Sequence, residues 1–97
     1  MRSIEQTKAF KQDFKRESTG RYRLILKEEF RDIVLDLAND RPLKERYCDH
    51  ALTGSRKGFR LCHIRPNLVL LYLKINDEVR IVRLVRLGDH KKALDIE

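Results

Sequence analysis

Six consecutive apolar residues, Leu68–Leu73 (LVLLYL), place the strongest constraint on how this chain can fold. Because successive side chains of a β-strand point to opposite faces, an unbroken apolar run predicts a strand that is buried on both faces. No run in the sequence approaches the ~20 apolar residues of a membrane span. A chain of 97 residues suits one domain, residues 1–97, with a single modest core around such a strand.

Two further strands are predicted to flank this run. Residues 59–65 alternate loosely between polar and apolar side chains, and Pro66-Asn67 after them is a turn signal. A second turn is expected at residues 75–77. Residues 79–87 then form a third strand, which carries arginines at every third position. The pattern predicts an antiparallel meander in the second half of the chain.

The first half of the chain has a short strand followed by helical patterns. Residues 2–7 can form the strand. Thr7 can cap a helix in which Phe10 and Phe14 share one face, and residues 18–20 end it.

Residues 21–39 predict a second helix, because six apolar side chains recur at helical spacing until Asn39-Asp40-Arg41-Pro42 stops it. These side chains are Tyr22, Leu26, Phe30, Ile33, Val34 and Leu37.

The predicted order is β-α-α-β-β-β, which indicates an α+β fold. The N-terminal helices pack on one face of a small, mainly antiparallel, twisted sheet. Residues 43–58 are expected to form a long irregular connection, and Gly88-Asp89 leads to a tail with one helical turn. The other face of the sheet stays partly open, which is where a ligand groove could form.

Charge is distributed unevenly over the sequence. The net charge is +7, and residues 46–97 hold 11 Lys or Arg against 6 Asp or Glu. No acidic residue occurs from His50 to Asn76, although five cations do. A solvated basic face is the simpler explanation for each single charge. For the whole acid-free segment we favour a site for a polyanion, such as nucleic acid.

Cys48, His50, Cys62 and His63 are possible zinc ligands, but their spacing fits no common structural zinc pattern. Cys62 and His63 are also neighbours on a predicted strand, so their side chains should point to opposite faces. We therefore expect no metal site and no cofactor. The sequence opens without the apolar segment of a signal peptide, and reduced thiols in the cytoplasm are the expectation.

The three histidines suit metal-independent RNA cleavage. A base must remove the proton of the ribose 2′-OH, an acid must protonate the leaving oxygen, and cations must stabilise the charge on phosphorus. Imidazole serves either proton role near neutral pH, and arginine binds phosphate with paired hydrogen bonds. His50, His63 and His90, with Arg60, Arg65, Arg83 and Arg86 nearby in sequence, supply these groups.

Alternation along residues 59–65 gives each side chain a face. Phe59, Leu61, His63 and Arg65 share one side, and Arg60, Cys62 and Ile64 share the other. Apolar residues occur on both sides, so alternation alone does not decide which side is buried. We expect Cys62 and Ile64 to face the helices, which puts His63 and Arg65 on the open face.

Four ordered blocks resemble a known family. They are Asp49-His50-Ala51-Leu52-x-Gly54, Phe59-Arg60-x-Cys62-His63-Ile64-x-Pro66, Leu70-Leu71-Tyr72 and Arg86-Leu87-Gly88-x-His90. Together they resemble the YafQ branch of the RelE superfamily, the toxins of bacterial type II toxin–antitoxin pairs. The resemblance implies a cytoplasmic mRNA endonuclease that cuts codons in the ribosomal A site, where it also contacts rRNA.

The same resemblance assigns roles to residues of this chain. His50, His63 and His90 match catalytic histidines, and Arg86 matches a basic residue at the scissile phosphate. We favour His50 or His63 as the general base and His90 as the acid or a phosphate contact. The expected substrate-binding residues are Arg56, Lys57, Arg60, Arg65, Asn67, Arg83 and Leu94.

The chain departs from the family pattern at three places. Asn67 stands where the family often has Asp, Leu94 where it often has Phe, and Arg56-Lys57 where it often has Trp-Lys. Asn cannot exchange a proton, and Leu cannot stack on a base as an aromatic ring does. These differences bear on rate and codon preference, and they leave open a weakened or inactive enzyme.

The resemblance further implies an antitoxin, an acidic or amphipathic protein that covers the basic groove of the toxin. Two other functions fit the same scaffold. One is a non-enzymatic inhibitor like the ParE relatives that bind gyrase, which needs no histidines. The other is a basic RNA-binding module that leaves RNA intact.

Overall fold

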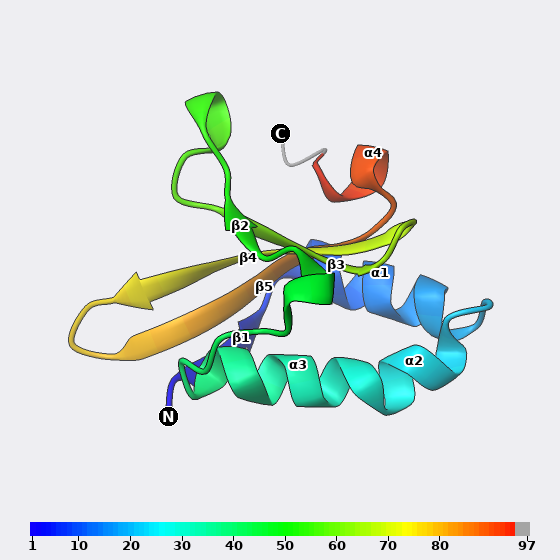
Figure 1. The fold of residues 1–97 in the computed structure, drawn as a ribbon, viewed down its shortest axis with the longest axis horizontal. Helices are drawn as coiled ribbons and strands as arrows, with labels where there is room; N and C mark the ends of the chain where they lie inside the picture. Colours follow the sequence, from blue (N-terminus) through cyan, green and yellow to red (C-terminus); the bar gives the residue numbers. More distant parts are fainter. Residues whose placement is uncertain (95–97) are drawn as a thin grey trace.

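The computed structural model describes residues 1–94, so residues 95–97 of the predicted domain lie outside it. Five strands form one sheet in the order β1-β5-β4-β3-β2 (Figure 1). Their bounds are Ser3–Gln6 (β1), His50–Ala51 (β2), Arg60–Arg65 (β3), Leu68–Asn76 (β4) and Arg80–Gly88 (β5). β1 pairs with β5 in parallel, and the other pairs are antiparallel. The mainly antiparallel sheet and the three-strand meander are confirmed.

β4 is the central strand, and its apolar run is buried on both faces as predicted. Residues 68–72 are each 0% exposed. Leu68, Leu70 and Tyr72 point into the main core, which lies between the sheet and the helices. Val69 and Leu71 point to the other side, where they meet Leu61 and Ala93 in a second, smaller core.

Three helices cover the main core: α1 (Lys8–Ser18), α2 (Arg23–Lys27) and α3 (Glu29–Ala38). α1 begins as expected, because Thr7 Oγ1 accepts a hydrogen bond of 3.0 Å from the Phe10 amide. The single helix predicted over residues 21–39 is wrong. The chain breaks at Glu28 (φ −118°, ψ −73°), which separates α2 from α3, although the apolar stripe continues across the break.

The opposite face carries α4 (His90–Ala93), and the connection over residues 43–58 begins beside α3 and crosses the edge of the sheet to reach that face (Figure 1). That connection is less irregular than predicted: it contains the 3-10 turns η1 (Glu45–Tyr47) and η2 (Gly54–Arg56), with β2 between them. The expected helical turn near the C-terminus is confirmed as α4. Within the described part of the chain, no helix combines the length and the apolarity that crossing a membrane would require.

Candidate active site

Three segments bring the three histidines together on the face opposite the α1–α3 layer. β2, β3 and α4 supply His50, His63 and His90 in turn. The ring centroids of His50 and His63 are 5.8 Å apart, and those of His63 and His90 are 4.9 Å apart. The predicted convergence of these rings, which are up to 40 positions apart in the chain, is therefore present in the structure.

Backbone geometry fixes the orientation of His50. Cys48 adopts a left-handed conformation (φ 48°, ψ 45°), which is uncommon for a residue other than glycine. Its carbonyl oxygen lies 2.6 Å from His50 Nδ1. A carbonyl can only accept, so Nδ1 carries the proton. In the neutral ring, Nε2 of His50 is then left with a lone pair that can accept a proton.

The pleat of β3 fixes the face of His63. Cys62 and Ile64 lie in the main core under the helices, at 0% and 3% exposure, as predicted. His63 lies between them in sequence and therefore points to the opposite face. Cys62 and His63 cannot both reach one metal ion, because they point to opposite faces of the sheet.

Gly88 and Asp89 place His90. Gly88 has φ 151°, and a side chain there would press on the Arg16 guanidinium, which is 3.0 Å from the Cβ position. Asp89 caps α4, because its side chain accepts a hydrogen bond of 2.8 Å from the Lys92 amide. These two residues end β5 and turn the chain so that His90 opens α4 beside β3.

His63 and His90 interact directly through their outer ring nitrogens. The two Nε2 atoms are 3.0 Å apart, a distance at which one ring donates a proton and the other accepts it. Burial lowers the pKa of His63 below its ordinary value, and the neighbouring His90 and His50 lower it further. The lowered pKa favours the neutral form of His63, in which a ring nitrogen can accept a hydrogen bond.

The His90→Ala variant is expected to raise the pKa of His63 toward its ordinary value, because part of the burial and the electrostatic effect of the neighbouring ring are removed. NMR titration of the His63 ring protons measures this pKa. The matched variant His50→Ala should raise it less, since His50 lowers the pKa of His63 less than His90 does. An unchanged His63 midpoint in His90→Ala would show that the two rings do not interact in solution.

Arg86 is held by a buried carboxylate. Its Nε and Nη2 donate to Asp13 of α1 at 2.7 and 3.2 Å. Asp13 also accepts from the Leu87 amide at 3.0 Å and from Arg16 at 2.9 Å. Burial alone would raise the pKa of Asp13, but these hydrogen-bond donors lower it below its ordinary value. Asp13 thus fixes the end of β5, just before the turn that leads to His90.

Cross-strand pairing relates Arg86 to the histidines. Leu61 lies opposite His50 on one side and opposite Leu71 on the other. Leu71 in turn lies opposite Arg86. Arg86 and His50 therefore stand in one cross-strand row, about 14 Å or three strand spacings apart, and the Arg86 guanidinium reaches from that row to Asp13 of α1.

Arg65 does not lie on the open face, so that expectation is wrong. The pairing of β3 with β4 shifts between His63 and Arg65, and this irregularity breaks the alternation. The Arg65 guanidinium reaches Glu29 of α3 with two hydrogen bonds of 2.9 Å each. It nevertheless remains at the rim of the histidine pocket described below.

Arg60 lies on the side of β3 that faces the helices, away from His63. It is paired with Tyr72, whose ring is fully buried in the main core. The Arg60 guanidinium bonds Asp49 at 3.3 Å and the Tyr72 hydroxyl at 3.3 Å. The structure therefore does not bring Arg60 to the histidines, and the role in substrate binding expected for it is not supported.

The other expected binding residues lie outside the lining of the histidine pocket, each in a different environment. Arg83 pairs with Glu5 of β1 at 2.8 Å, and Lys57 is exposed after η2. Arg56 donates to the Leu94 carbonyl at 3.3 Å. The Leu94 side chain packs against the second core, which indicates a structural role for it. Asn67 is exposed in the turn between β3 and β4.

A pocket of about 370 Å³ opens beside the histidines. Its lining residues are Arg46, Tyr47, His63, Ile64, Arg65, Pro66 and His90. Arg46 and Tyr47, with Glu29 behind them, did not emerge from the sequence as site residues. The only local signal was their position directly before the segment that contains His50.

Comparisons with known proteins identify a family for this chain. A family model described as the bacterial toxin of type II toxin–antitoxin systems, YafQ, matches residues 2–95. The mRNA interferase toxin YafQ of Escherichia coli K12 is 40% identical over 58 residues, 60% of each chain. The matched region thus spans about three-fifths of the length of the curated relatives.

Two solved structures are similar over nearly the whole chain. YafQ in the E. coli DinJ–YafQ complex is 31% identical with a TM-score of 0.72, covering 97% of this chain and 99% of that one. A metal-bound toxin from Helicobacter pylori is 38% identical with a TM-score of 0.73, covering 94% and 97% of the two chains. The RelE-like α+β fold expected from the sequence is confirmed.

Proposed function

Since the chain belongs to the YafQ family of bacterial toxins of type II toxin–antitoxin systems, we propose that it is a ribosome-dependent mRNA endonuclease. It cuts the message in the A site by acid–base attack of the ribose 2′-OH and so inhibits translation. The similar E. coli toxins are known as mRNA interferases, which supports this activity. The observation that carries the proposal is the convergence of three imidazole rings in one cluster.

His50 is the group best prepared to act as the general base. Its Nδ1–H group donates a hydrogen bond to the Cys48 carbonyl oxygen, so Nε2 of the neutral ring is free to accept a proton. In the proposed first step, Nε2 removes the proton of the 2′-OH, and the oxygen attacks the adjacent phosphorus. A 2′,3′-cyclic phosphate forms as the bond from phosphorus to the 5′ oxygen breaks.

His90 is proposed as the acid that protonates the leaving 5′ oxygen. Its Nε2 lies 3.0 Å from that of His63, whose lowered pKa favours the neutral form, so His90 can be the donor of this pair. His63 lies between the other two rings, in contact with both, and so orients His90 by accepting a hydrogen bond from it when substrate is absent. All bond changes balance within the RNA and the imidazoles, and no cofactor enters the reaction.

Cations are proposed to stabilise the negative charge that builds on phosphorus. Arg86 is the candidate for the scissile phosphate, because Asp13 fixes its guanidinium in one orientation. Arg56, Lys57, Arg83 and Asn67 are proposed to contact RNA farther from the cleaved bond. The net charge of +7 favours this binding over the whole surface.

An antitoxin is the proposed protein partner. The similar E. coli toxin forms a complex with DinJ, and a chain of charge +7 attracts an acidic partner on electrostatic grounds. We place the pair in the cytoplasm, where messages and ribosomes are found.

Induced expression followed by mapping of mRNA 5′ ends tests the proposed function. We expect new ends that keep codon phase and that disappear when the start codon of a reporter message is removed. The His50→Ala, His63→Ala double variant is the control and should leave messages intact. Cuts in random phase would instead indicate a free ribonuclease. Intact messages during growth arrest would indicate the non-enzymatic inhibitor.

A further inference from the structure

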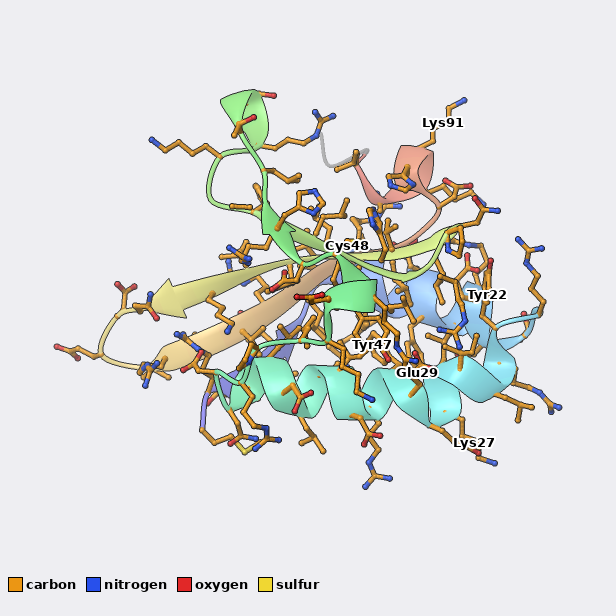
Figure 2. All side chains as sticks on the ribbon, viewed as in Figure 1. Tyr22, Lys27, Glu29, Tyr47, Cys48 and Lys91 are labelled. Atoms are coloured by element: carbon orange, nitrogen blue, oxygen red, sulfur yellow. The ribbon has the colours of Figure 1, made fainter. Side chains whose placement is uncertain are left out.

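Four side chains beside the histidines form a connected polar cluster around Glu29. Glu29 accepts two hydrogen bonds from Arg65, each 2.9 Å, and one of 2.5 Å from the Tyr47 hydroxyl. Arg46 approaches the same carboxylate at 3.9 Å and donates to the Tyr47 hydroxyl at 3.1 Å. Figure 2 shows Tyr47 and Glu29 meeting between η1 and α3. The cluster therefore links these two elements.

The cluster carries a net positive charge. Two guanidinium groups share one carboxylate, which leaves one cation uncompensated. Hydrogen bonds from Arg65 and Tyr47 lower the pKa of Glu29 from its ordinary value of 4.5 to about 2, so this carboxylate is ionised at neutral pH. An excess of one positive charge matches the single negative charge of an RNA phosphate.

Arg46 is the member of the cluster that solvent reaches most easily. Its side chain is 63% exposed, against 39% for Arg65 and 24% for Glu29. Its guanidinium carbon stands 5.0 Å from the centre of the Tyr47 ring, which is buried and gives it a fixed support. The remaining N–H groups of Arg46 are thus held in place for an outside acceptor.

The cluster and the histidines border one cavity. Arg46, Tyr47 and Arg65 line the same 370 Å³ pocket as His63 and His90. This volume lies in the range of ~300–1,000 Å³ that is typical of ligand pockets. A ribose–phosphate chain whose cleaved bond lies at the histidines would continue past this cluster.

We propose that Arg46, supported by Tyr47 and held with Arg65 by Glu29, forms a second phosphate site, which binds the nucleotide next to the cleaved bond. This inference rests on RNA being the substrate, as proposed above. It assigns a binding role to Arg46 and positioning roles to Tyr47 and Glu29. The site would hold the RNA backbone by its charge and would contribute no proton to the reaction.

The test measures binding of a short single-stranded oligoribonucleotide to proteins that also carry His63→Ala, so that the RNA is not cut. Each phosphate contact on a single strand contributes about 0.7 to the slope of log affinity against log salt concentration. Arg46→Ala should therefore make the slope shallower by about 0.7 and weaken binding about tenfold. Arg46→Lys keeps the charge and should keep the slope.

Arg80→Ala is the matched control. Arg80 has a similar exposure, 57%, and likewise pairs with a carboxylate, Asp40 at 2.6 Å. Its loss should leave the slope close to that of the parent protein. Equal changes in Arg46→Ala and Arg80→Ala would overturn the proposal, because binding would then reflect overall charge alone. An unchanged slope in Arg46→Ala would overturn it as well.

A second measurement, of mRNA cleavage by the protein that retains His63, distinguishes failure of this inference from failure of the proposed function. If that protein leaves messages intact while Arg46→Ala still flattens the slope, the nuclease assignment fails and the phosphate site stands. If messages are cut and the slope does not change, the nuclease assignment stands and the phosphate site fails.

Discussion

Replacing His63 with alanine is expected to slow mRNA cleavage by about 10²-fold, the loss that a displacement of about 1 Å in a catalytic group can cause, because His63 positions His90. The reason is geometric. His63 is in contact with both other rings, 5.8 Å from His50 and 4.9 Å from His90 between centroids, so its loss disconnects the cluster. Primer extension on a defined message in a translation reaction, followed over time, gives the rate.

The His63 side chain is half-buried on the open face, so its removal should leave the fold intact. Circular dichroism and the thermal unfolding midpoint serve as controls for folding. Affinity for the oligoribonucleotide should also stay near that of the parent protein. A folded His63→Ala protein that cuts at the parent rate would remove the histidine cluster from the mechanism.

Replacing Asp13 with alanine is expected to lower the free energy of unfolding by about 3 kcal/mol, the lower end of the range for breaking a buried ion pair. The Asp13 side chain is 3% exposed and that of Arg86 is 19% exposed, so neither charge can be fully solvated by water. The Leu87 amide, which is also buried, would lose its acceptor. Urea denaturation measures the change.

Asp36→Ala is the control for Asp13→Ala. Asp36 also lies on a helix and pairs with an arginine, Arg41 at 2.9 Å, but its side chain is 36% exposed and that of Arg41 is 58% exposed. Such surface pairs contribute about 0–1 kcal/mol, so this variant should unfold near the parent midpoint. If the two variants lost equal stability, Asp13 would not be the buried anchor that the structure indicates.

Structural features that depend on residues close together in the chain could be predicted from the sequence. The LVLLYL run identified the central strand because an apolar sequence without alternation requires cover on both faces. Thr7 marked the start of α1 because its side chain can bond the third following amide. The break at Glu28 was not readable, since the apolar side chains keep helical spacing on both sides of it.

The sequence predicted those features of the site that follow from the chemistry of single residues. It did not predict those that depend on contacts between residues far apart in the chain. Three histidines in a basic segment pointed to acid–base chemistry, and the structure brings them together. Asp13 and Arg86 are 73 positions apart, and no local pattern relates them. The register shift before Arg65 also leaves no local pattern, so strict alternation put its side chain on the wrong face.

The parallel pairing of β1 with β5 has a consequence for the timing of assembly. β1 is bonded within the sheet to β5 alone, with Ser3 opposite Ile81 and Gln6 opposite Leu84. In a nascent chain, β1 therefore stays unpaired until β5, the last described strand, has been synthesised. His90 follows that strand, so the three rings cannot meet before β5 has been synthesised and has paired with the rest of the sheet. The histidine cluster is therefore one of the last features of the described fold to form.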